Sequence, residues 1–299
     1  MNTADMTATI AKGNGFIAAL DQSGGSTPKA LRAYGVEDSE WSGDEEMFGK
    51  IHEMRSRIVE SPSFSGEKVV GAILFEKTMD GMIGGKTTPQ ALIDKGVVPF
   101  IKIDKGLEDE ANGVQLMKPM PDLDALLTRA KGLGVFGTKE RSVINAADPE
   151  GIAAIIRQQF EVGKKVLAHG MMPILEPEYS LKAEDRAKGE VMLKSEILKQ
   201  LDVMDEGQQV MLKLSIPKTP NLYKDVAQHP RVLKVVALSG GYSREEACSE
   251  LEKNEGMIAS FSRALLEELR AHMSDEDFDT ALGEAIDAIH CASTQKVAG

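Results

Sequence analysis

The sequence predicts an α/β fold of the closed (β/α)8 class, the TIM barrel, with residues 1–299 forming a single domain. Two observations lead to this prediction: short apolar, β-branched runs recur along the chain, and a helical pattern follows each run. Such near-continuous apolar runs are typical of parallel strands buried on both faces. The predicted strands cover residues 15–20, 69–75, 97–103, 134–138, 171–175, 209–214, 233–238 and 257–261. An open doubly wound sheet is the alternative, but eight strand–helix units in one chain favour a closed barrel.

Residues that start and stop helices lie between these runs. The start signals, in order, are Thr27-Pro28, Asp148-Pro149, the capping box of Ser243 with Glu246, and Ser274. Gly35 and Gly170 are stop signals. The acidic residues 38–53 predict a surface excursion after the first unit, and the charged residues 178–207 predict a helix on the outside of the barrel.

Charge and composition exclude several classes of function. A formal net charge of -12 argues against nucleic-acid binding, which needs a basic surface. A small phosphorylated ligand is compatible with this charge only if Lys and Arg side chains gather in one cleft. The two cysteines, Cys248 and Cys291, form no CxxC pair, which fits a reduced cytoplasmic compartment. No signal peptide and no membrane-spanning apolar stretch is evident, so we expect a cytoplasmic protein without a membrane partner.

Charged and polar residues follow or interrupt the predicted strands. Barrel enzymes carry their catalytic groups at the carboxyl ends of the strands, on one rim. The residues at these ends are Asp21, Lys102, Asp104, Lys139, Arg141, Glu176, Glu178, Lys213, Ser239, Gly240, Gly241, Ser260, Ser262 and Arg263. We therefore expect one site there, with its cations forming the local positive cluster that an anionic ligand requires.

Lys213 lies inside an apolar strand, VMLKLSIP. Burial of a charged ammonium is costly, which favours the neutral amine, and a neutral amine attacks carbonyl groups to form Schiff bases. From periodicity alone, a lysine that reaches water or pairs with a carboxylate is an equally good interpretation.

Glu176 and Glu178 stand two residues apart in PILEPEYS. Strand alternation places both side chains on the same face. A pair of carboxylates pushes the two pKa values apart, which suits general acid–base chemistry. The alternative is a salt bridge from this pair to a lysine on the rim.

Two glycine-rich loops each precede a helix: LSGGYSREEA, and DQSGGSTPKAL with Ser23 and Ser26. Backbone N–H groups at a helix N-terminus bind phosphate well. Two such loops on one rim indicate a doubly phosphorylated ligand. A metal site is not expected, because the five histidines are scattered and show neither HxH nor HExxH spacing.

In combination, these stretches resemble class I fructose-bisphosphate aldolases, in particular the short bacterial form. The similarity covers nearly the whole chain, in eight stretches: FIAALDQSGGSTPKAL, GAILFEKTM, VVPFIKIDKG, FGTKERS, PILEPE, VMLKLSIP, LSGGYSREEA and SFSRAL. The resemblance implies a lyase that reversibly cleaves fructose 1,6-bisphosphate into dihydroxyacetone phosphate and glyceraldehyde 3-phosphate, in glycolysis or gluconeogenesis. It implies a Schiff-base mechanism without a metal or other cofactor.

The resemblance also implies roles for individual residues. Lys213 resembles the Schiff-base lysine, and Glu176 the acid–base that dehydrates the carbinolamine. Asp21 resembles the residue that handles the proton of the C4 hydroxyl. Lys139 resembles the lysine that stabilises charge near the reacting carbons, with Lys102 beside it.

Further positions resemble the family's substrate contacts. Arg141 resembles a basic residue that lines the cleft. The residues that resemble the C1-phosphate site are Ser239, Gly240, Gly241, Ser260 and Arg263. Ser23 and Ser26 are the candidates for the second phosphate.

The chain departs from the animal pattern of this family in three places. Gln22 stands where that pattern has a glutamate that helps to hold substrate. Ala30 stands where it has a basic residue near the second phosphate. The final residues, CASTQKVAG, lack the terminal tyrosine that assists proton transfer.

Two alternatives stay open from the sequence. One is another Schiff-base barrel, such as a transaldolase or a deoxyribose-phosphate aldolase, although the two phosphate-type loops favour a bisphosphate. The other is a barrel that binds sugar phosphates without catalysis, against which the set of Lys213, Glu176 and Asp21 counts. A homo-oligomer is compatible with the sequence.

Overall fold

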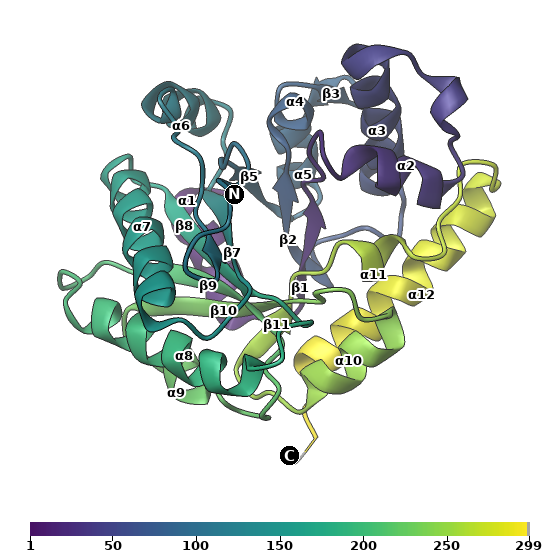
Figure 1. The fold of residues 1–299 in the computed structure, drawn as a ribbon. Coiled ribbons are helices and arrows are strands. Elements are labelled where there is room, and N and C mark those ends of the chain that lie inside the picture. Colours follow the sequence, from purple (N-terminus) through teal and green to yellow (C-terminus); the bar gives the residue numbers. More distant parts are fainter. Residues whose placement is uncertain (298–299) are drawn as a thin grey trace.

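Eight parallel strands form a ring in the computed structural model, which describes residues 1–297 (Figure 1). In ring order they are β1 (Phe16–Leu20), β2 (Val69–Leu74), β5 (Val98–Lys102), β7 (Gly137–Ile144), β8 (Met172–Tyr179), β9 (Val210–Ser215), β10 (Val232–Leu238) and β11 (Met257–Ala259). Each strand pairs in parallel with the next. Between the last and the first, the N–H of Ala19 donates to the carbonyl of Phe261 at 3.0 Å. The predicted (β/α)8 barrel is thereby confirmed.

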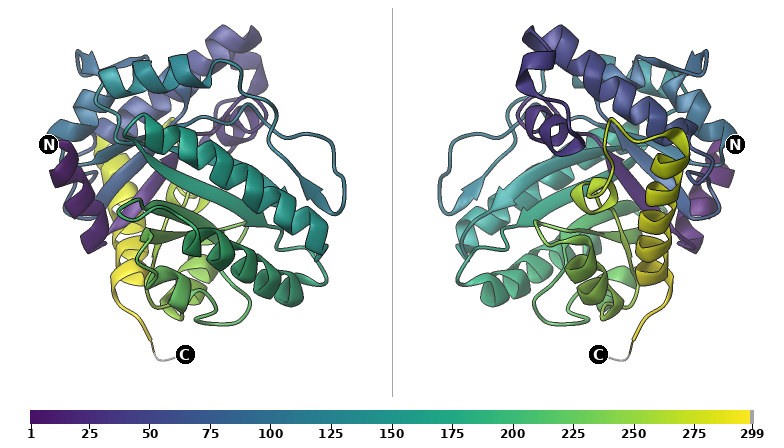
Figure 2. Two further views of the ribbon diagram at one scale, coloured as in Figure 1. Left: turned by 90° about the vertical axis from the view of Figure 1, so that its left-hand side faces the viewer. Right: turned by 90° about the vertical axis from the view of Figure 1, so that its right-hand side faces the viewer.

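Helices surround this ring. They are α2 (Thr27–Tyr34), α3 (Gly43–Glu60), α4 (Glu76–Met79), α5 (Thr88–Asp94), α6 (Leu123–Gly132), α7 (Pro149–Ala168), α8 (Arg186–Asp202), α9 (Lys224–Ala227), α10 (Arg244–Glu252), α11 (Arg263–Leu266) and α12 (Asp275–Thr294). Figure 2 shows α7 on one flank of the barrel and α12 on the other. Within residues 1–297, none of the helices has the length and apolar character needed to cross a bilayer.

Smaller elements lie in the loops between the strands and helices. They are the 3-10 helix η1 (Asp38–Glu40), the hairpin of β3 (Met82–Ile83) with β4 (Lys86–Thr87), and β6 (Val114–Gln115), which pairs antiparallel with β7. Capping follows the sequence signals. Asp148 accepts from the N–H of Gly151 at 2.8 Å, and Ser243 and Glu246 form the capping box at the start of α10.

The apolar core has two layers. The outer layer lies between the strands and the helices, and the inner layer fills the barrel with side chains such as Ile17, Phe100 and Ile174. A further helix, α1 (Thr3–Lys12), adds Met6 and Ile10 to the inner layer beside residues at the strand starts. Because α1 packs at that end, the strands' carboxyl ends form the open rim.

The predicted bounds of two strands were wrong. Residues 134–138 were expected to form the fourth strand, which is observed at Gly137–Ile144, and the fifth extends to Tyr179 instead of residue 175. The charged residues beyond each apolar run resembled the end of a strand. In the folded chain they continue the ladder, with Arg141 opposite Glu176 and Val143 opposite Glu178. Neighbouring strands thus supply opposite charges, which lets a polar sequence remain extended inside the barrel.

The acidic residues 38–53 were expected to form a surface excursion, and this was wrong for their second half. They lead into α3, which buries Met47, Ile51 and Met54 against the outer layer. The same helix carries Arg55, whose side chain is fully buried.

Candidate active site

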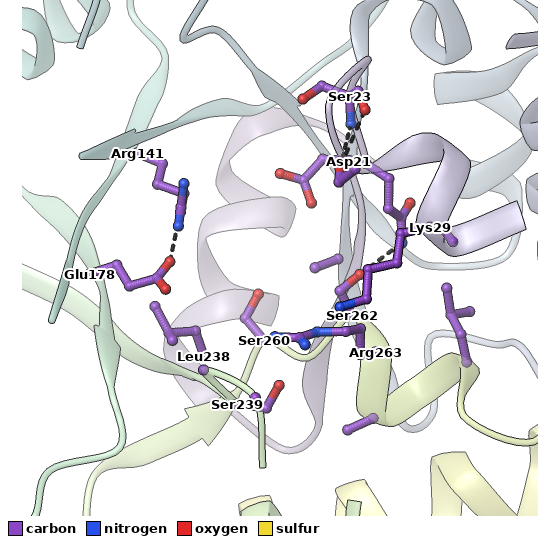
Figure 3. Close-up of a pocket in the computed structure, with 18 of the residues that line it drawn as sticks. Asp21, Ser23, Lys29, Arg141, Glu178, Leu238, Ser239, Ser260, Ser262 and Arg263 are labelled. Atoms are coloured by element: carbon purple, nitrogen blue, oxygen red, sulfur yellow. Dashed lines mark hydrogen bonds and ion pairs between the residues drawn. The ribbon is translucent and has the colours of Figure 1, made fainter. Parts of the chain in front are cut away.

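A cavity of about 840 Å³ opens at the carboxyl ends of the strands (Figure 3). Every residue predicted to be catalytic or to bind substrate lines it, whereas Asp104, also named at a strand end, does not. These residues are Asp21, Ser23, Ser26, Lys102, Lys139, Arg141, Glu176, Lys213, Ser239, Gly240, Gly241, Ser260 and Arg263. They come from seven strands or from the segments that follow them, so closure of the barrel is what gathers them.

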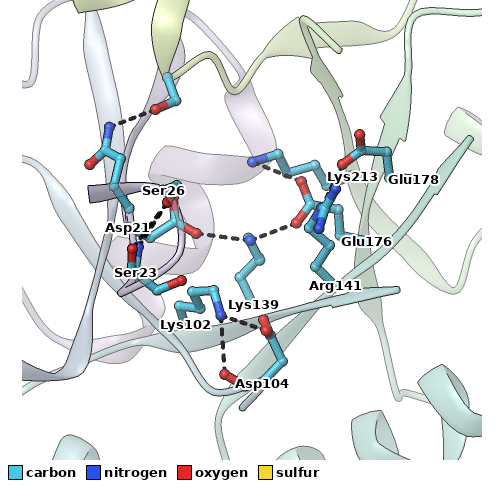
Figure 4. A network of polar contacts seen from close by, with 12 residues as sticks. Asp21, Ser23, Ser26, Lys102, Asp104, Lys139, Arg141, Glu176, Glu178 and Lys213 are labelled. Atoms are coloured by element: carbon cyan, nitrogen blue, oxygen red, sulfur yellow. Dashed lines mark hydrogen bonds and ion pairs between the residues drawn. The ribbon is translucent and has the colours of Figure 1, made fainter. Parts of the chain in front are cut away.

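Four buried charged side chains form a continuous chain across the floor of the cavity (Figure 4). The Nζ of Lys213 lies 3.1 Å from Oε1 of Glu176. The other oxygen of Glu176 lies 2.6 Å from Nζ of Lys139, which is also 2.8 Å from Oδ2 of Asp21. Lys139 therefore bridges the carboxylates of Asp21 and Glu176. Lys213 contacts Glu176 closely enough to transfer a proton to it.

Burial and charge act in opposite directions on these groups. Burial raises the pKa of Asp21, but Lys139 and Lys213 outweigh it and hold that pKa well below its usual range. The same two lysines outweigh burial at Glu176 and lower its pKa. Burial lowers the pKa of Lys139, but Asp21 and Glu176 outweigh it and raise that pKa. The site thus keeps Asp21 as a carboxylate and Lys139 as a fixed cation.

Glu176 and Glu178 do not act as a coupled carboxylate pair. Glu178 accepts from Nε of Arg141 at 2.6 Å, and this contact raises the pKa of Arg141 although burial opposes it. Each carboxylate on β8 contacts its own cation on β7: Lys139 contacts Glu176, and Arg141 contacts Glu178 although it lies opposite Glu176 in the register. Glu176 thus forms the salt bridge to lysines on the rim that was the alternative interpretation, whereas Glu178 pairs with an arginine.

Lys102 lies beside this chain on β5. Its Nζ contacts Oδ1 of Asp104 at 2.5 Å and the carbonyl of Asp104 at 3.1 Å. This pairing leaves Lys102 on the wall of the cavity, next to Lys139 on the neighbouring strand, where Cα atoms of the two residues are in register.

A second cluster of polar groups lies where β10 and β11 end. Gly240 and Gly241 have φ angles of 60° and 124°, a conformation that other residues rarely adopt, and α10 begins just after them. Nη2 of Arg263 lies 3.6 Å from the position a Cβ of Gly241 would occupy. Within residues 1–297, Arg263 forms no ion pair. A free guanidinium over a glycine loop is a suitable place for a phosphate.

Lys29 and the contact between Gln22 and Ser262 were not predicted from the sequence. Lys29 projects into the cavity from α2, one position before Ala30 (Figure 3). Ser262 lies between Ser260 and Arg263, and Gln22 reaches it with a hydrogen bond of 2.7 Å. The sequence placed Ser260 and Ser262 together at the end of the last strand, but nothing local joins Gln22 to Ser262.

Among the described residues, no three His, Cys, Asp or Glu side chains are grouped in a way that could hold a metal ion.

Comparison with solved structures finds the same architecture elsewhere. A fructose-bisphosphate aldolase from Plasmodium falciparum, in complex with TRAP and a small-molecule inhibitor, superposes with a TM-score of 0.82 at 20% identity, covering 99% of this chain and 96% of that chain. A protein from Corynebacterium glutamicum superposes with a TM-score of 0.53 at 12% identity, covering 97% and 92%. At these identities the likeness is one of fold.

The sequence itself gives the family. The family model described as fructose-bisphosphate aldolase class I matches residues 2–222, which include Asp21, Lys139, Glu176 and Lys213. The matched segment is well over half of the polypeptide and contains all four of the buried charged side chains described above. The protein belongs to the class I fructose-bisphosphate aldolases, a family of lyases.

Proposed function

We propose that this cavity reversibly cleaves fructose 1,6-bisphosphate through a Schiff base on Lys213. The observation that carries the proposal is the chain from Lys213 through Glu176 and Lys139 to Asp21, buried at the floor of a cavity with a free arginine at its side. It supplies an amine, an acid–base group, a fixed cation and a carboxylate base within one substrate length.

Each group has a step in the proposed mechanism. Transfer of a proton from Lys213 to Glu176 leaves an amine, which attacks the C2 ketone. Glu176 then gives a proton to the carbinolamine hydroxyl, which leaves as water, and an iminium forms. Asp21 takes the proton of the C4 hydroxyl, the C3–C4 bond breaks, and its electron pair moves into the iminium to give an enamine and an aldehyde. Protonation of the enamine at C3 and hydrolysis release dihydroxyacetone phosphate.

Lys139 is the electrostatic support of this sequence. Its ammonium lies between Asp21 and Glu176 and offsets the negative charge of Asp21 before it takes a proton and of Glu176 after it gives one up. For the phosphates, we assign C1 to Arg263 and the Gly240-Gly241 loop, and the second to Ser23 and Ser26 at the start of α2. Lys102 and Arg141 line the wall between them.

The proposal extends to the form of the family, the domain organisation and the compartment. The departures at Gln22 and Ala30 separate the chain from the animal pattern and support the short bacterial form. The superposition with one aldolase over 99% of the chain supports a single catalytic domain. We also propose a cytoplasmic enzyme, on the cysteine content alone.

Borohydride trapping tests the covalent step. Reduction in the presence of dihydroxyacetone phosphate should add one substrate-derived mass to the peptide that carries Lys213, with EDTA present throughout. Lys213→Met should abolish the label, whereas the matched variant Lys102→Met should keep it. A label on Lys139 or Lys102 in the parent protein would overturn the assignment.

A pair of carboxylate variants separates cleavage from imine formation. Asp21→Asn keeps the size of the side chain and loses the basic oxygen. It should still form a trappable imine with fructose 1,6-bisphosphate but cleave it about 100-fold more slowly or worse, because a positioned base contributes about 10²–10⁴-fold. Glu176→Gln should slow imine formation itself. Cleavage by Asp21→Asn at the parent rate would mean that Asp21 is structural.

A further inference from the structure

Arg55 is a buried cation that the proposed mechanism does not use. Its side chain is fully buried, and burial lowers its pKa to about 9, although Asp21 opposes the shift. Nη1 donates to Oγ1 of Thr78 at 2.6 Å. Nη2 donates to the backbone carbonyl of Gln22 at 2.7 Å and to its Oε1 at 2.9 Å. Within residues 1–297 this guanidinium has no carboxylate in hydrogen-bond contact: Nη1 and Nη2 donate to neutral oxygens only, and the buried Nε has no partner.

These contacts fix the orientation of the Gln22 amide. A guanidinium only donates hydrogen bonds, so the atom that faces Arg55 must be the oxygen of the amide. The NH₂ group of Gln22 therefore points the other way, where Nε2 donates to Oγ of Ser262 at 2.7 Å. This bond joins the segment after β1 to the segment after β11, next to the Ala19–Phe261 hydrogen bond that closes the barrel.

The orientation of the amide in turn fixes the role of Ser262. Its hydroxyl accepts from Gln22, so its own proton must go to a different acceptor. Among the described residues no oxygen accepts that proton, and Ser262 lines the cavity beside Arg263 (Figure 3). Ser260, 1% exposed, also lines the cavity, and its Oγ has no partner. Two hydroxyls and a free guanidinium thus face the same space, which suits an anion that accepts several hydrogen bonds.

We propose that Arg55, Gln22 and Ser262 form a donor relay that makes the Ser262 hydroxyl a phosphate-binding group. Every link donates toward the cavity: the guanidinium to the amide oxygen, the amide N–H to the hydroxyl, and the hydroxyl to a phosphate oxygen. Gln22 and Arg55 are positioning residues, and Ser262 contacts the ligand. The inference rests on the proposed function, and it adds a specific ligand to the C1-phosphate site.

A glutamate at position 22 would reverse the relay. A carboxylate accepts from both neighbours, so the Ser262 hydroxyl would donate to it and turn its lone pairs toward the phosphate. Phosphate oxygens only accept, and they gain nothing from such a group. Gln22 and Ser262 are therefore expected to act as a pair, each useful for phosphate binding only with the other.

A double-mutant cycle tests the relay. The three variants are Ser262→Ala, Gln22→Glu and the double variant, and the ligands are inorganic phosphate, by calorimetry, and dihydroxyacetone phosphate, by the concentration dependence of borohydride trapping. Ser262→Ala should weaken both about tenfold or more, since a hydrogen bond to a charged group is lost. In the Gln22→Glu background the same substitution should cost less than about twofold.

Unphosphorylated dihydroxyacetone is the matched control ligand. Its trapping on Lys213 should be equal in all four proteins, which a merely structural defect near the barrel closure would not allow. Equal costs of Ser262→Ala in both backgrounds, or no cost in either, would overturn the relay. A parent protein that binds inorganic phosphate but traps nothing on Lys213 would contradict the proposed function and leave the cycle measurable.

Discussion

At the scale of single residues, Glu140 is a fully buried carboxyl group without an ion-pair partner among residues 1–297. It lies on β7 between Lys139 and Arg141, and strand alternation turns its side chain to the face opposite theirs. The side chain is fully buried and neither carboxyl oxygen has a hydrogen-bond partner. Burial raises the pKa of Glu140 well above its usual range, and Asp104 raises it further while Lys139 opposes the shift. Burial therefore favours the neutral, protonated form of this carboxyl group.

This predicts a dependence of stability on pH. Above the usual glutamate pKa of about 4.3 the unfolded chain loses the proton that the folded chain keeps, so the stability falls as the pH rises toward the raised pKa. Glu140→Gln removes the titrating carboxyl group and with it this dependence of stability on pH. The stability gain of the variant over the parent protein should grow between pH 5.5 and pH 8 by more than about 1.4 kcal/mol, measured by chemical denaturation. Glu161→Gln, at an exposed position of α7, should show no such growth, and parallel pH profiles for Glu140→Gln and the parent would contradict the prediction.

The sequence predicts single residues best where charge interrupts an apolar strand. Lys213 and Glu176 were identified this way, and burial of a charge in such a run is rare enough to stand out. Gln22 and Ser262 could not be paired, because they are 240 positions apart and meet only when the barrel closes. The burial of Arg55 was not predicted, because the acidic residues that precede it in the sequence indicated a solvent-exposed segment.

At the scale of elements, parallel strands were predictable and their ends were not. β7 and β8 continue past their apolar runs because the charges on one strand match those on the other, and such a match depends on a register that no local pattern shows. The N-terminal helix α1 was missed for a related reason. It presents only Met6 and Ile10 to the inner core, too few apolar positions to show a clear helical period.

The position of α1 predicts a separation of stability from activity. Ile10 is fully buried at the end of the barrel opposite the cavity. Ile10→Ala should lower the free energy of unfolding by about 2–5 kcal/mol, the range for truncating a core isoleucine. The cleavage rate at 25 °C should stay within about twofold of the parent, because no cavity residue moves. Ala8→Ser, on the exposed side of the same helix, is the control for stability. A rate that falls together with stability would show that α1 is coupled to the site.

At the scale of the whole molecule, the cavity and the surface carry opposite charge. The chain has a formal net charge of -12, yet its cavity is lined by more cations than anions. The cations are Lys29, Lys102, Lys139, Arg141, Lys213 and Arg263, and the anions are Asp21, Glu176, Glu178 and Glu267. An anionic substrate is therefore repelled at long range and attracted at short range, and salt screens these two interactions at different concentrations.

The screening lengths predict a maximum in the rate. At 0.01 M salt the Debye length is about 30 Å, so a bisphosphate senses the whole anionic surface. At about 0.15 M it is about 8 Å, which removes most of that repulsion while the field inside the cavity persists. Near 1 M, at about 3 Å, the attraction is screened as well. We expect kcat/KM for fructose 1,6-bisphosphate to rise between 0.01 and 0.15 M salt and to fall toward 1 M. Trapping of unphosphorylated dihydroxyacetone should change little over the same range. A steady decline from the lowest salt would mean that the substrate responds to the cavity alone, and that the acidic surface lies too far from its path to matter.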